Sequence, residues 1–345
     1  MNRSRIRGIV FLLAISALAY LPFVARLGYY NDDWYLMYSA GVRGPSVFWD
    51  IFGVDRPLRA LVTIPAYWLF GANPLFYNLS AYAFRVLGAL ALLWTLRMLW
   101  PRQHSATFVM ALLFLVYPGF LSQPNAIDYQ SHLVGLAAAL LSVAATRKAV
   151  LSEGRAATWL WFAFSILLGW FYLGQMEWYI GFEFFRWGCV FLLSSRQGGT
   201  LIQKGWRALG RAFPALTAPI AFLTWRVFFF QAERGATDLG AQLVTSDYSP
   251  AVNVLTRLAY LAKDMVNVLV SAWGVPLYQL TSQLDLKPSL AGFAVATLAA
   301  GLAFLWLRRI PDGNGEQGES RWQTETLWLG LFAALFGLLP VILVN

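Results

Sequence analysis

Charged residues, cysteine and histidine are all scarce in this chain of 345 residues. Charged residues make up 12% of the sequence and hydrophobic residues 59%, whereas soluble proteins carry about 25% charged residues. The single cysteine, Cys189, excludes an internal disulfide and a cysteine-based metal site. The two histidines, His104 and His132, exclude a histidine-rich zinc site. The composition therefore points away from a soluble domain and from zinc chemistry.

The phosphate-binding loop of nucleotide-dependent enzymes, Gly-x-x-x-x-Gly-Lys-Ser/Thr, is also absent. Chemistry on cytoplasmic nucleotide sugars therefore has no support. The net charge of +9 would suit binding of nucleic acid. The basic residues, however, are distributed as in the cytoplasmic loops of a membrane protein. We expect no nucleic-acid partner.

Ten apolar runs of near-membrane length follow one another along the chain. A helix needs about 20 apolar residues to cross a bilayer, and a single helix satisfies its own backbone hydrogen bonds in lipid. The sequence therefore predicts an all-α polytopic membrane protein with about nine or ten transmembrane helices. It forms a single transmembrane domain over 1–345, with no separate soluble domain. The runs are about 9–27, 74–99, 106–121, 131–146, 158–175, 178–195, 213–230, 259–277, 289–307 and 327–344.

The basic residues indicate the side of the membrane on which each loop lies. Lysine and arginine collect in cytoplasmic loops, and a cytoplasmic N-terminus places most of them on that side. The segment 9–27 lacks a small-residue cleavage site, so we expect an uncleaved first span. We predict a multi-pass protein of a bacterial-type inner membrane with its active site on the outer, periplasmic face. The inner basic residues are Arg3, Arg5, Arg7, Arg97, Arg102, Arg147, Lys148, Arg155, Arg196, Lys204, Arg207 and Arg211.

One apolar run, 259–277, breaks this alternation. If it crossed the membrane, the Arg308–Arg309 pair would face outward, and its own Lys263–Asp264 pair would be costly at mid-membrane. We predict that it lies along the outer surface within a large outer loop, 231–288, which leaves about nine spans. The chain then ends outside at Asn345, as expected of a short form relative to longer relatives.

The first outer loop, 28–72, carries two acids followed by two arginines. Asp32 and Asp33 lie among tyrosine and tryptophan at the membrane–water boundary, on an extended loop where adjacent side chains point in different directions. Residues 57–70 are too few to span the membrane, so we expect a short interfacial helix there. Arg56 and Arg59 at headgroup level either hold a phosphate in a bidentate way or anchor this helix to anionic lipid.

The order of these features resembles the GT-C superfamily of membrane glycosyltransferases. The resemblance covers about residues 9–100 and rests on Asn-Asp-Asp-Trp at 31–34, Asp-Arg-Pro-Leu at 55–58 and Phe-Gly-Ala-Asn-Pro at 70–74, between two spans. This superfamily includes protein O-mannosyltransferases and bacterial lipid A aminoarabinose transferases, which use polyprenyl-phosphate sugars. The resemblance implies an inverting transferase that moves a sugar from a polyprenyl monophosphate to an acceptor at the outer face.

A carboxylate of the first outer loop is the catalytic base that the resemblance implies. Displacement at an anomeric carbon needs a base on the acceptor and positive charge on the leaving phosphate. Either Asp32 or Asp33 takes the role of base, and the other acid is structural. The predicted substrate contacts are Arg56, Arg59 and Arg226 toward the phosphate, and Asp128, His132 and Glu177 toward the donor or acceptor.

Two of these groups have competing interpretations. Asp128 and His132 are four residues apart and would share one helix face, as an acid–base pair, a sugar-binding rim, half of a metal site or a capped helix start. Many GT-C members carry Lys-Glu in the hairpin that here contains Glu177. Gln175 or Met176 stands in place of the lysine, and Glu177 is either a pocket residue or a solvated turn acid.

Charged residues also occur within the predicted spans, where they usually face the bundle interior. Glu183 and Arg186 are three residues apart and are predicted to neutralise each other. Arg85 is predicted to make a structural contact between helices. Arg226 lies near the outer end of its run, within reach of a lipid-linked phosphate.

Two other functions are compatible with the sequence. A transporter or flippase of a lipid-linked sugar needs a polar path through both membrane halves, whereas the acids here concentrate outside. A non-catalytic membrane subunit would position a partner enzyme. The outer acids and His132 offer hard ligands for a divalent cation, which GT-C members with monophosphate donors generally do not require. The acceptor stays open among lipid, glycan and protein.

Overall fold

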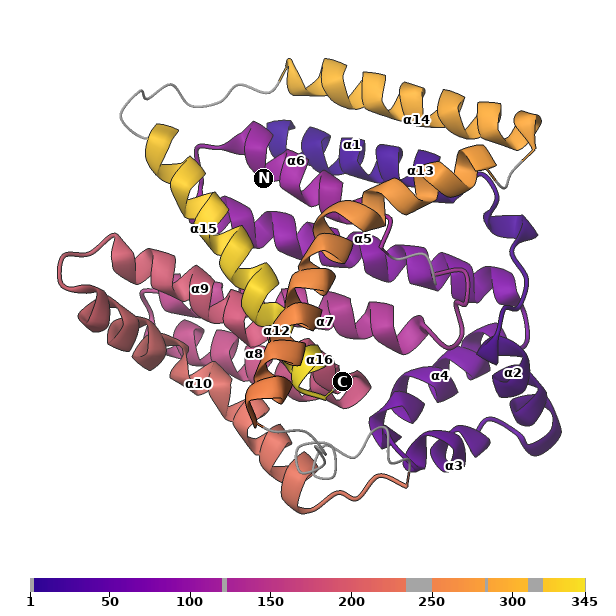
Figure 1. Ribbon diagram of the computed structural model, residues 1–345, viewed down its shortest axis with the longest axis horizontal. Helices are drawn as coiled ribbons and strands as arrows, with labels where there is room; N and C mark the ends of the chain where they lie inside the picture. The colour runs from indigo at the N-terminus through magenta and orange to yellow at the C-terminus, as the bar shows by residue number, and fades with distance from the viewer. Residues whose placement is uncertain (1–2, 120–122, 234–249, 283–284, 310–318, 345) are drawn as a thin grey trace.

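The computed structural model describes residues 3–119, 123–233, 250–282, 285–309 and 319–344, and the elements in these ranges are helical (Figure 1). This confirms the prediction of an all-α protein. The α-helices are α1 (Arg3–Tyr20), α2 (Asp32–Arg43), α3 (Val47–Gly53), α4 (Ala60–Phe70), α5 (Pro74–Leu99), α6 (His104–Leu115), α7 (Gln130–Leu151), α8 (Arg155–Gln175), α9 (Phe182–Ser195), α10 (Leu201–Phe228), α12 (Pro250–Val266), α13 (Ala272–Ser282), α14 (Leu286–Leu307), α15 (Glu319–Gly337) and α16 (Leu339–Val344).

Six segments among the described residues are long and apolar enough to cross a membrane. These segments support a membrane protein. Helices α6 and α9 have 12 and 14 residues, so they are about 18–21 Å long, against a hydrocarbon core of about 30 Å. Membrane crossing by these helices and by α10 stays a prediction. The six segments are Gly8–Arg26, Pro74–Leu99, Gln130–Leu151, Arg155–Gln175, Leu286–Leu307 and Arg321–Ile342.

The apolar run 259–277 belongs to a bent helical arm formed by α12 and α13 (Figure 1, orange). A π-helical turn, Asn267–Ser271, joins the two helices. The arm is not among the six segments above. Residues 234–249 and 283–284 of the predicted loop 231–288 lie outside the described residues, so the placement of that loop stays a prediction.

Helix α7 forms the centre of the bundle. Of its most apolar 18-residue stretch, 83% is buried inside the protein. Small residues let neighbouring backbones approach α7 closely. A methyl group at Gly88 of α5 would lie 3.7 Å from the α-carbon of Ala137, and one at Gly135 would lie 2.8 Å from the ring of Tyr179. The N-terminal half of α7 therefore has a fixed place against α5 and the turn after α8.

A buried ion pair joins α9 to α7 and α8. The Arg186 Nε atom donates to Glu183 Oε2 at 2.8 Å, and this confirms the predicted pair. The Arg186 Nη1 atom donates to Ser165 Oγ at 2.8 Å and to the Ser142 carbonyl at 3.1 Å. Tyr172 donates its hydroxyl hydrogen to Glu183. Each charge therefore finds hydrogen-bond partners within the bundle, as a charge buried in a membrane protein requires.

Arg85 of α5 makes the structural contact that the sequence predicted. Its guanidinium donates to the carbonyl oxygens of Leu115 and Tyr117, at 2.7 and 2.6 Å, and to Gln123 Oε1 at 2.5 Å. Carbonyl groups at a helix C-terminus lack intrahelical partners. Arg85 therefore satisfies the C-terminal end of α6 and holds the chain that leads toward α7.

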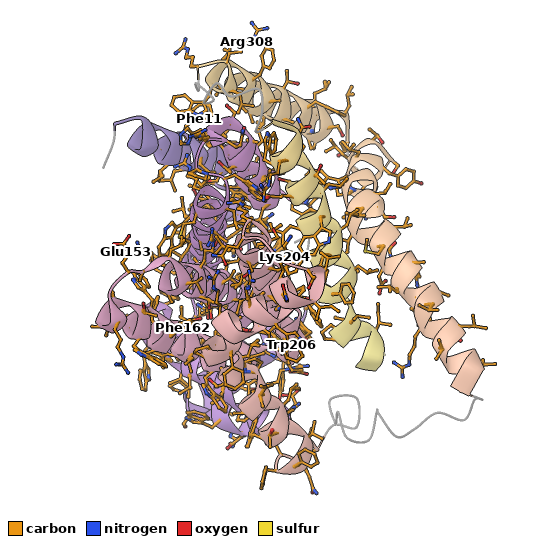
Figure 2. All side chains as sticks on the ribbon, turned by 90° about the vertical axis from the view of Figure 1, so that its left-hand side faces the viewer. Phe11, Glu153, Phe162, Lys204, Trp206 and Arg308 are labelled. Atoms are coloured by element: carbon orange, nitrogen blue, oxygen red, sulfur yellow. The ribbon has the colours of Figure 1, made fainter. Side chains whose placement is uncertain are left out.

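The two ends of the bundle differ in what they carry. Figure 2 looks onto the end that bears Glu153, Lys204 and Arg308. Figure 1 shows α2, α3 and α4 gathered at the opposite end, on the right. Glu153, Lys204 and Arg308 share one end (Figure 2), and the side of the membrane that this end faces stays a prediction. The acids and arginines of the segment 28–72 lie at the other end.

Replacing Arg186 by methionine should destabilise the protein, because Glu183 would be left as an unpaired buried charge. Breaking a buried pair costs about 3–5 kcal/mol. We expect a lower Tm in detergent, partly restored in the double variant Arg186→Met with Glu183→Gln. The matched control is Arg102→Met, because Arg102 is exposed. Equal Tm values for the Arg186 and Arg102 variants would contradict this role of the pair.

Candidate active site

Asp32 and Asp33 are the first two residues of α2, so the prediction of an extended loop was wrong. Acids are favoured in the first turn of a helix because its free N–H groups carry positive potential. Neighbouring residues of a helix point about 100° apart, so the predicted divergence of the two side chains is confirmed. Asp33 is 1% exposed, whereas Asp32 is exposed to solvent.

Asp33 anchors the start of α2 to the turn before α7. Its Oδ1 atom accepts hydrogen bonds from the backbone N–H groups of Ile127 at 3.1 Å and Asp128 at 3.0 Å. Its Oδ2 atom accepts from the Tyr30 N–H at 3.3 Å. With its amide nitrogen turned toward Asp33, Asn125 donates to Oδ1 at 2.6 Å and to the Tyr30 carbonyl at 2.8 Å. The geometry gives Asp33 the structural role within the pair.

Burial raises the pKa of Asp33 from 3.8 to about 6, although the three backbone N–H donors act in the opposite direction. The negative charge of Asp128 adds to the rise. Asp32 has a different environment, because its side chain is exposed to solvent. Asp32 is the acid of the pair that an external substrate can reach.

Arg56 and Glu177 form a bidentate pair between the segment 28–72 and the turn after α8. The Nε and Nη2 atoms of Arg56 donate to Glu177 Oε2 at 2.9 Å and Oε1 at 2.8 Å. The guanidinium also lies 4.9 Å from the ring centre of Trp178. Burial by itself would raise the pKa of Glu177, but the hydrogen bonds and charge of Arg56 hold this pKa below its ordinary value.

The backbone makes room for this pair at Gly174. A side chain there would overlap Leu58, which follows Arg56 in the 3₁₀ turn Pro57–Arg59. The Gln175 Nε2 atom also donates to the Leu58 carbonyl at 3.0 Å. Gln175 is one of the two residues, with Met176, that stand where the GT-C resemblance would place a lysine, and its hydrogen bond fixes the turn without adding a charge.

Arg59 is buried and binds the chain before α7. Its Nη2 atom donates to the carboxylate and to the carbonyl of Asp128, both at 2.7 Å, and its Nε atom donates to Ser131 Oγ at 2.9 Å. Its guanidinium lies 4.3 Å from the ring centre of Phe52. Arg59 is 7% exposed, so within the protein it is a structural partner of Asp128.

The predicted helical pair of Asp128 and His132 does not form. Helix α7 begins at Gln130, so Asp128 precedes the helix and pairs with Arg59 instead. The His132 ring stacks on Tyr129, with 4.4 Å between ring centres, and lies 5.5 Å from Trp178. His132 therefore packs among aromatic rings, and Trp178 brings it close to Arg56 and Glu177.

Arg226 of α10 reaches the same cluster from the other side. Its Nη1 atom donates to the Asp55 carbonyl at 2.8 Å, and Arg56 Nη1 lies 3.6 Å from Asp55 Oδ2. The cavity between Asp55, Arg56, Glu177 and Arg226 measures about 10 Å³, which is room for about one water. The predicted phosphate-binding arginines are thus brought together, and in this conformation they bind groups of the protein.

An apolar groove of about 410 Å³ begins at the N-terminal end of α7. It lies between α4, α5, α7 and α8 and is lined by Leu61, Val62, Pro65, Ala66, Leu69, Phe84, Leu87, Gln130, Val134, Ala137, Ala138, Leu141, Leu168 and Phe171. Gln130 is its polar member. The Nε2 atom of Gln130 donates to Ser80 Oγ at 3.2 Å, while its Oε1 atom is buried without a partner.

Sequence reasoning missed Asn125, Ser131 and Gln130 as parts of this site. The signal for Asn125 and Gln130 was their place in the polar stretch 123–132, between two apolar runs. The binding of Asp33 by backbone amides carries no residue-type signal at all. The described residues contain no group of three or more His, Cys, Asp or Glu side chains that could hold a metal ion.

Asp33 should give the folding stability a specific pH dependence. Because its pKa rises from 3.8 to about 6 on folding, the folded state alone holds this proton between about pH 4 and pH 6. The unfolding free energy should therefore fall by about 3 kcal/mol as the pH rises through that window. Asp33→Asn should remove this component from Tm measured against pH. A variant with the same pH profile as the wild type would contradict it.

Comparisons with models of protein families, with curated protein sequences and with solved structures found no match to this chain. The resemblance to GT-C enzymes therefore rests on the residues of the chain itself. A functional proposal for this chain depends on the geometry around Asp32 and Asp33 and on the apolar groove at α7.

Proposed function

We propose that this protein is a membrane glycosyltransferase of the GT-C type. It transfers a sugar from a polyprenyl-phosphate carrier to an acceptor at the outer face of the membrane, with Asp32 as general base. The observation that carries the proposal is the division of roles in the acid pair. Asp33 is buried and hydrogen-bonded by the fold, whereas Asp32 is exposed. A carboxylate held in place and open to solvent can accept the proton of an incoming hydroxyl or amine.

The apolar groove supports a donor that is linked to a lipid. Gln130 lines the groove and lies two residues after Asp128, whose N–H group binds Asp33. From Gln130 to Leu141 the groove follows α7 for about 16 Å, at 1.5 Å per residue. A hydrocarbon chain in the groove would bring the attached headgroup to the level of the acid pair. The unpartnered Gln130 oxygen marks the point where a polar headgroup would begin.

The charged cluster beside the groove supplies the cation for the leaving phosphate. Arg56 is 14% exposed and already carries a bidentate carboxylate, Glu177. Guanidinium groups bind carboxylate and phosphate with the same fork geometry. A donor phosphate would therefore exchange with Glu177 for Arg56. The small cavity in this cluster means that such an exchange must accompany donor binding.

The buried charges of α9 favour an enzyme over a flippase. A flippase needs polar groups that are free to contact a headgroup deep in the membrane. Glu183 and Arg186 are instead bound by Tyr172, Ser142 and Ser165. The buried charges of Glu183 and Arg186 thus serve the fold. The exposed acid, Asp32, lies at one end of the bundle.

The substitution Asp32→Asn should abolish base catalysis and leave the fold intact. We expect release of polyprenyl phosphate from a purified polyprenyl-phosphate sugar to fall about 10²–10⁴-fold in rate, with little change in Tm. The matched control is Glu153→Gln, an exposed acid at the opposite end (Figure 2). Full turnover by Asp32→Asn would contradict the role of Asp32, and no turnover by the wild type with lipid, glycan and peptide acceptors supplied in turn would contradict the activity.

Filling the groove should weaken binding of the carrier lipid. Val134 lines the groove and is 7% exposed, so Val134→Phe places a ring where the chain would lie. We expect mass spectrometry of copurified lipids to find less polyprenyl phosphate in this variant. The matched control is Leu167→Phe on α8, because Leu167 is 67% exposed and outside the groove. Equal lipid content in the two variants would argue against the groove.

A further inference from the structure

A polar cavity of about 360 Å³ lies beside α2 and α3. It lies within the range of about 300–1,000 Å³ that is typical of small-molecule sites. A backbone hydrogen bond of 2.9 Å, from the Glu233 N–H to the Val54 carbonyl, fixes one wall. The lining residues are Tyr35, Arg43, Asp50, Ile51, Val54 and Glu233.

Asp32 does not line this cavity, but it lies one helical turn before Tyr35, which does. Tyr35 follows Asp32 by three residues in α2, so the two side chains lie on the same face, about 5–6 Å apart at their β-carbons. Tyr35 lines the cavity and is 58% exposed. A molecule in the cavity therefore lies next to the exposed acid rather than next to Asp33.

The cavity walls suit a hydrated ligand with many hydroxyl groups. Arg43 and Asp50 pair at 2.7 Å, but their side chains are 62% and 64% exposed. An exposed pair of this kind contributes little to stability, so both groups can turn from each other to a ligand at little cost. Asp50 and Glu233 offer acceptor oxygens, Arg43 offers donors, and Tyr35 offers an aromatic face.

We propose that this cavity is the acceptor site and that the acceptor is a saccharide chain. This inference rests on the proposed function, because it names the acceptor of the same reaction. Paired hydroxyl groups of a sugar donate to carboxylates, and the C–H face of a sugar ring packs on an aromatic ring. The three charged side chains in the lining disfavour a hydrocarbon chain. A basic peptide, which Asp50 and Glu233 would also attract, is the competing occupant that the trilysine titration tests.

The cavity sets the geometry of the transfer step. A hydroxyl oxygen of the bound saccharide forms the new bond to the anomeric carbon of the donor. The bond between that carbon and the phosphate oxygen breaks, and its electron pair leaves with the phosphate. The hydroxyl proton passes to the Asp32 carboxylate, so charge and atoms balance without a further reactant.

Saccharide binding can be measured without any donor lipid. The full chain in lipid nanodiscs is titrated with neutral trisaccharides (cellotriose, maltotriose and chitotriose) and with trilysine, and binding is followed by saturation-transfer NMR against empty nanodiscs. We expect at least one trisaccharide to bind and trilysine not to bind. Glu233→Gln should weaken binding about tenfold, because it removes a charged hydrogen-bond acceptor. Tyr35→Ala should weaken binding to a similar extent, about tenfold, because it removes the aromatic face on which a sugar ring packs.

Tyr38→Ala is the matched control. Tyr38 lies on the same helix and is 74% exposed, but it does not line the cavity. Binding that is unchanged in Tyr38→Ala and weakened in Tyr35→Ala supports the site. Absence of trisaccharide binding, binding of trilysine instead, or equal loss in both tyrosine variants overturns the inference.

Release of polyprenyl phosphate from the donor in the presence of the trisaccharides, measured in parallel, separates the two proposals. Saccharide binding without such release contradicts the proposed function and not the cavity. Release without saccharide binding contradicts the cavity and not the proposed function.

Discussion

The arrangement of this site depends on the burial of one carboxylate. Asp33 accepts hydrogen bonds from backbone groups on both sides of the site, at Tyr30 and at Ile127–Asp128. These bonds tie the first turn of α2 to the entrance of α7, the helix most buried in the bundle. Because Asp32 directly precedes Asp33 in α2, these bonds also fix the position of its backbone. The backbone of Asp32 is therefore fixed relative to the core of the bundle, although Asp32 lies in a segment between two predicted spans.

The same constraint explains why the arginines of the site are bound to the protein. An arginine brought close to a buried turn must find partners, because an unpaired buried charge is costly. Arg59 binds Asp128, Arg56 binds Glu177 and Arg226 binds the Asp55 carbonyl. The first two pairs connect the segment 28–72 with the starts of α7 and α9. In the proposed mechanism, a donor phosphate competes with Glu177 for Arg56, so donor binding and rearrangement of the cluster are linked.

The sequence predicted the helical class, the buried Glu183–Arg186 pair and the structural role of Arg85, because apolar length and charge in lipid are local signals. It singled out the acid pair but not which member is buried. The burial of Asp33 depends on backbone amides of Ile127 and Asp128, and no residue type encodes a backbone amide. It placed Asp128 on a helix with His132, since four-residue spacing favours that. Asp128 instead pairs with Arg59, which lies in a different segment of the chain. Local residue spacing cannot predict a contact between distant segments.

The most direct test of this account is a structure in nanodiscs with a non-hydrolysable polyprenyl-phosphonate sugar bound. We expect the polyprenyl chain to lie in the groove beside Val134 and the phosphonate to bind Arg56 in place of Glu177. We expect the anomeric carbon to face Asp32, with Asp33 still bound to Ile127 and Asp128. A headgroup bound elsewhere, or one that contacts Asp33 while Asp32 points away, would contradict it.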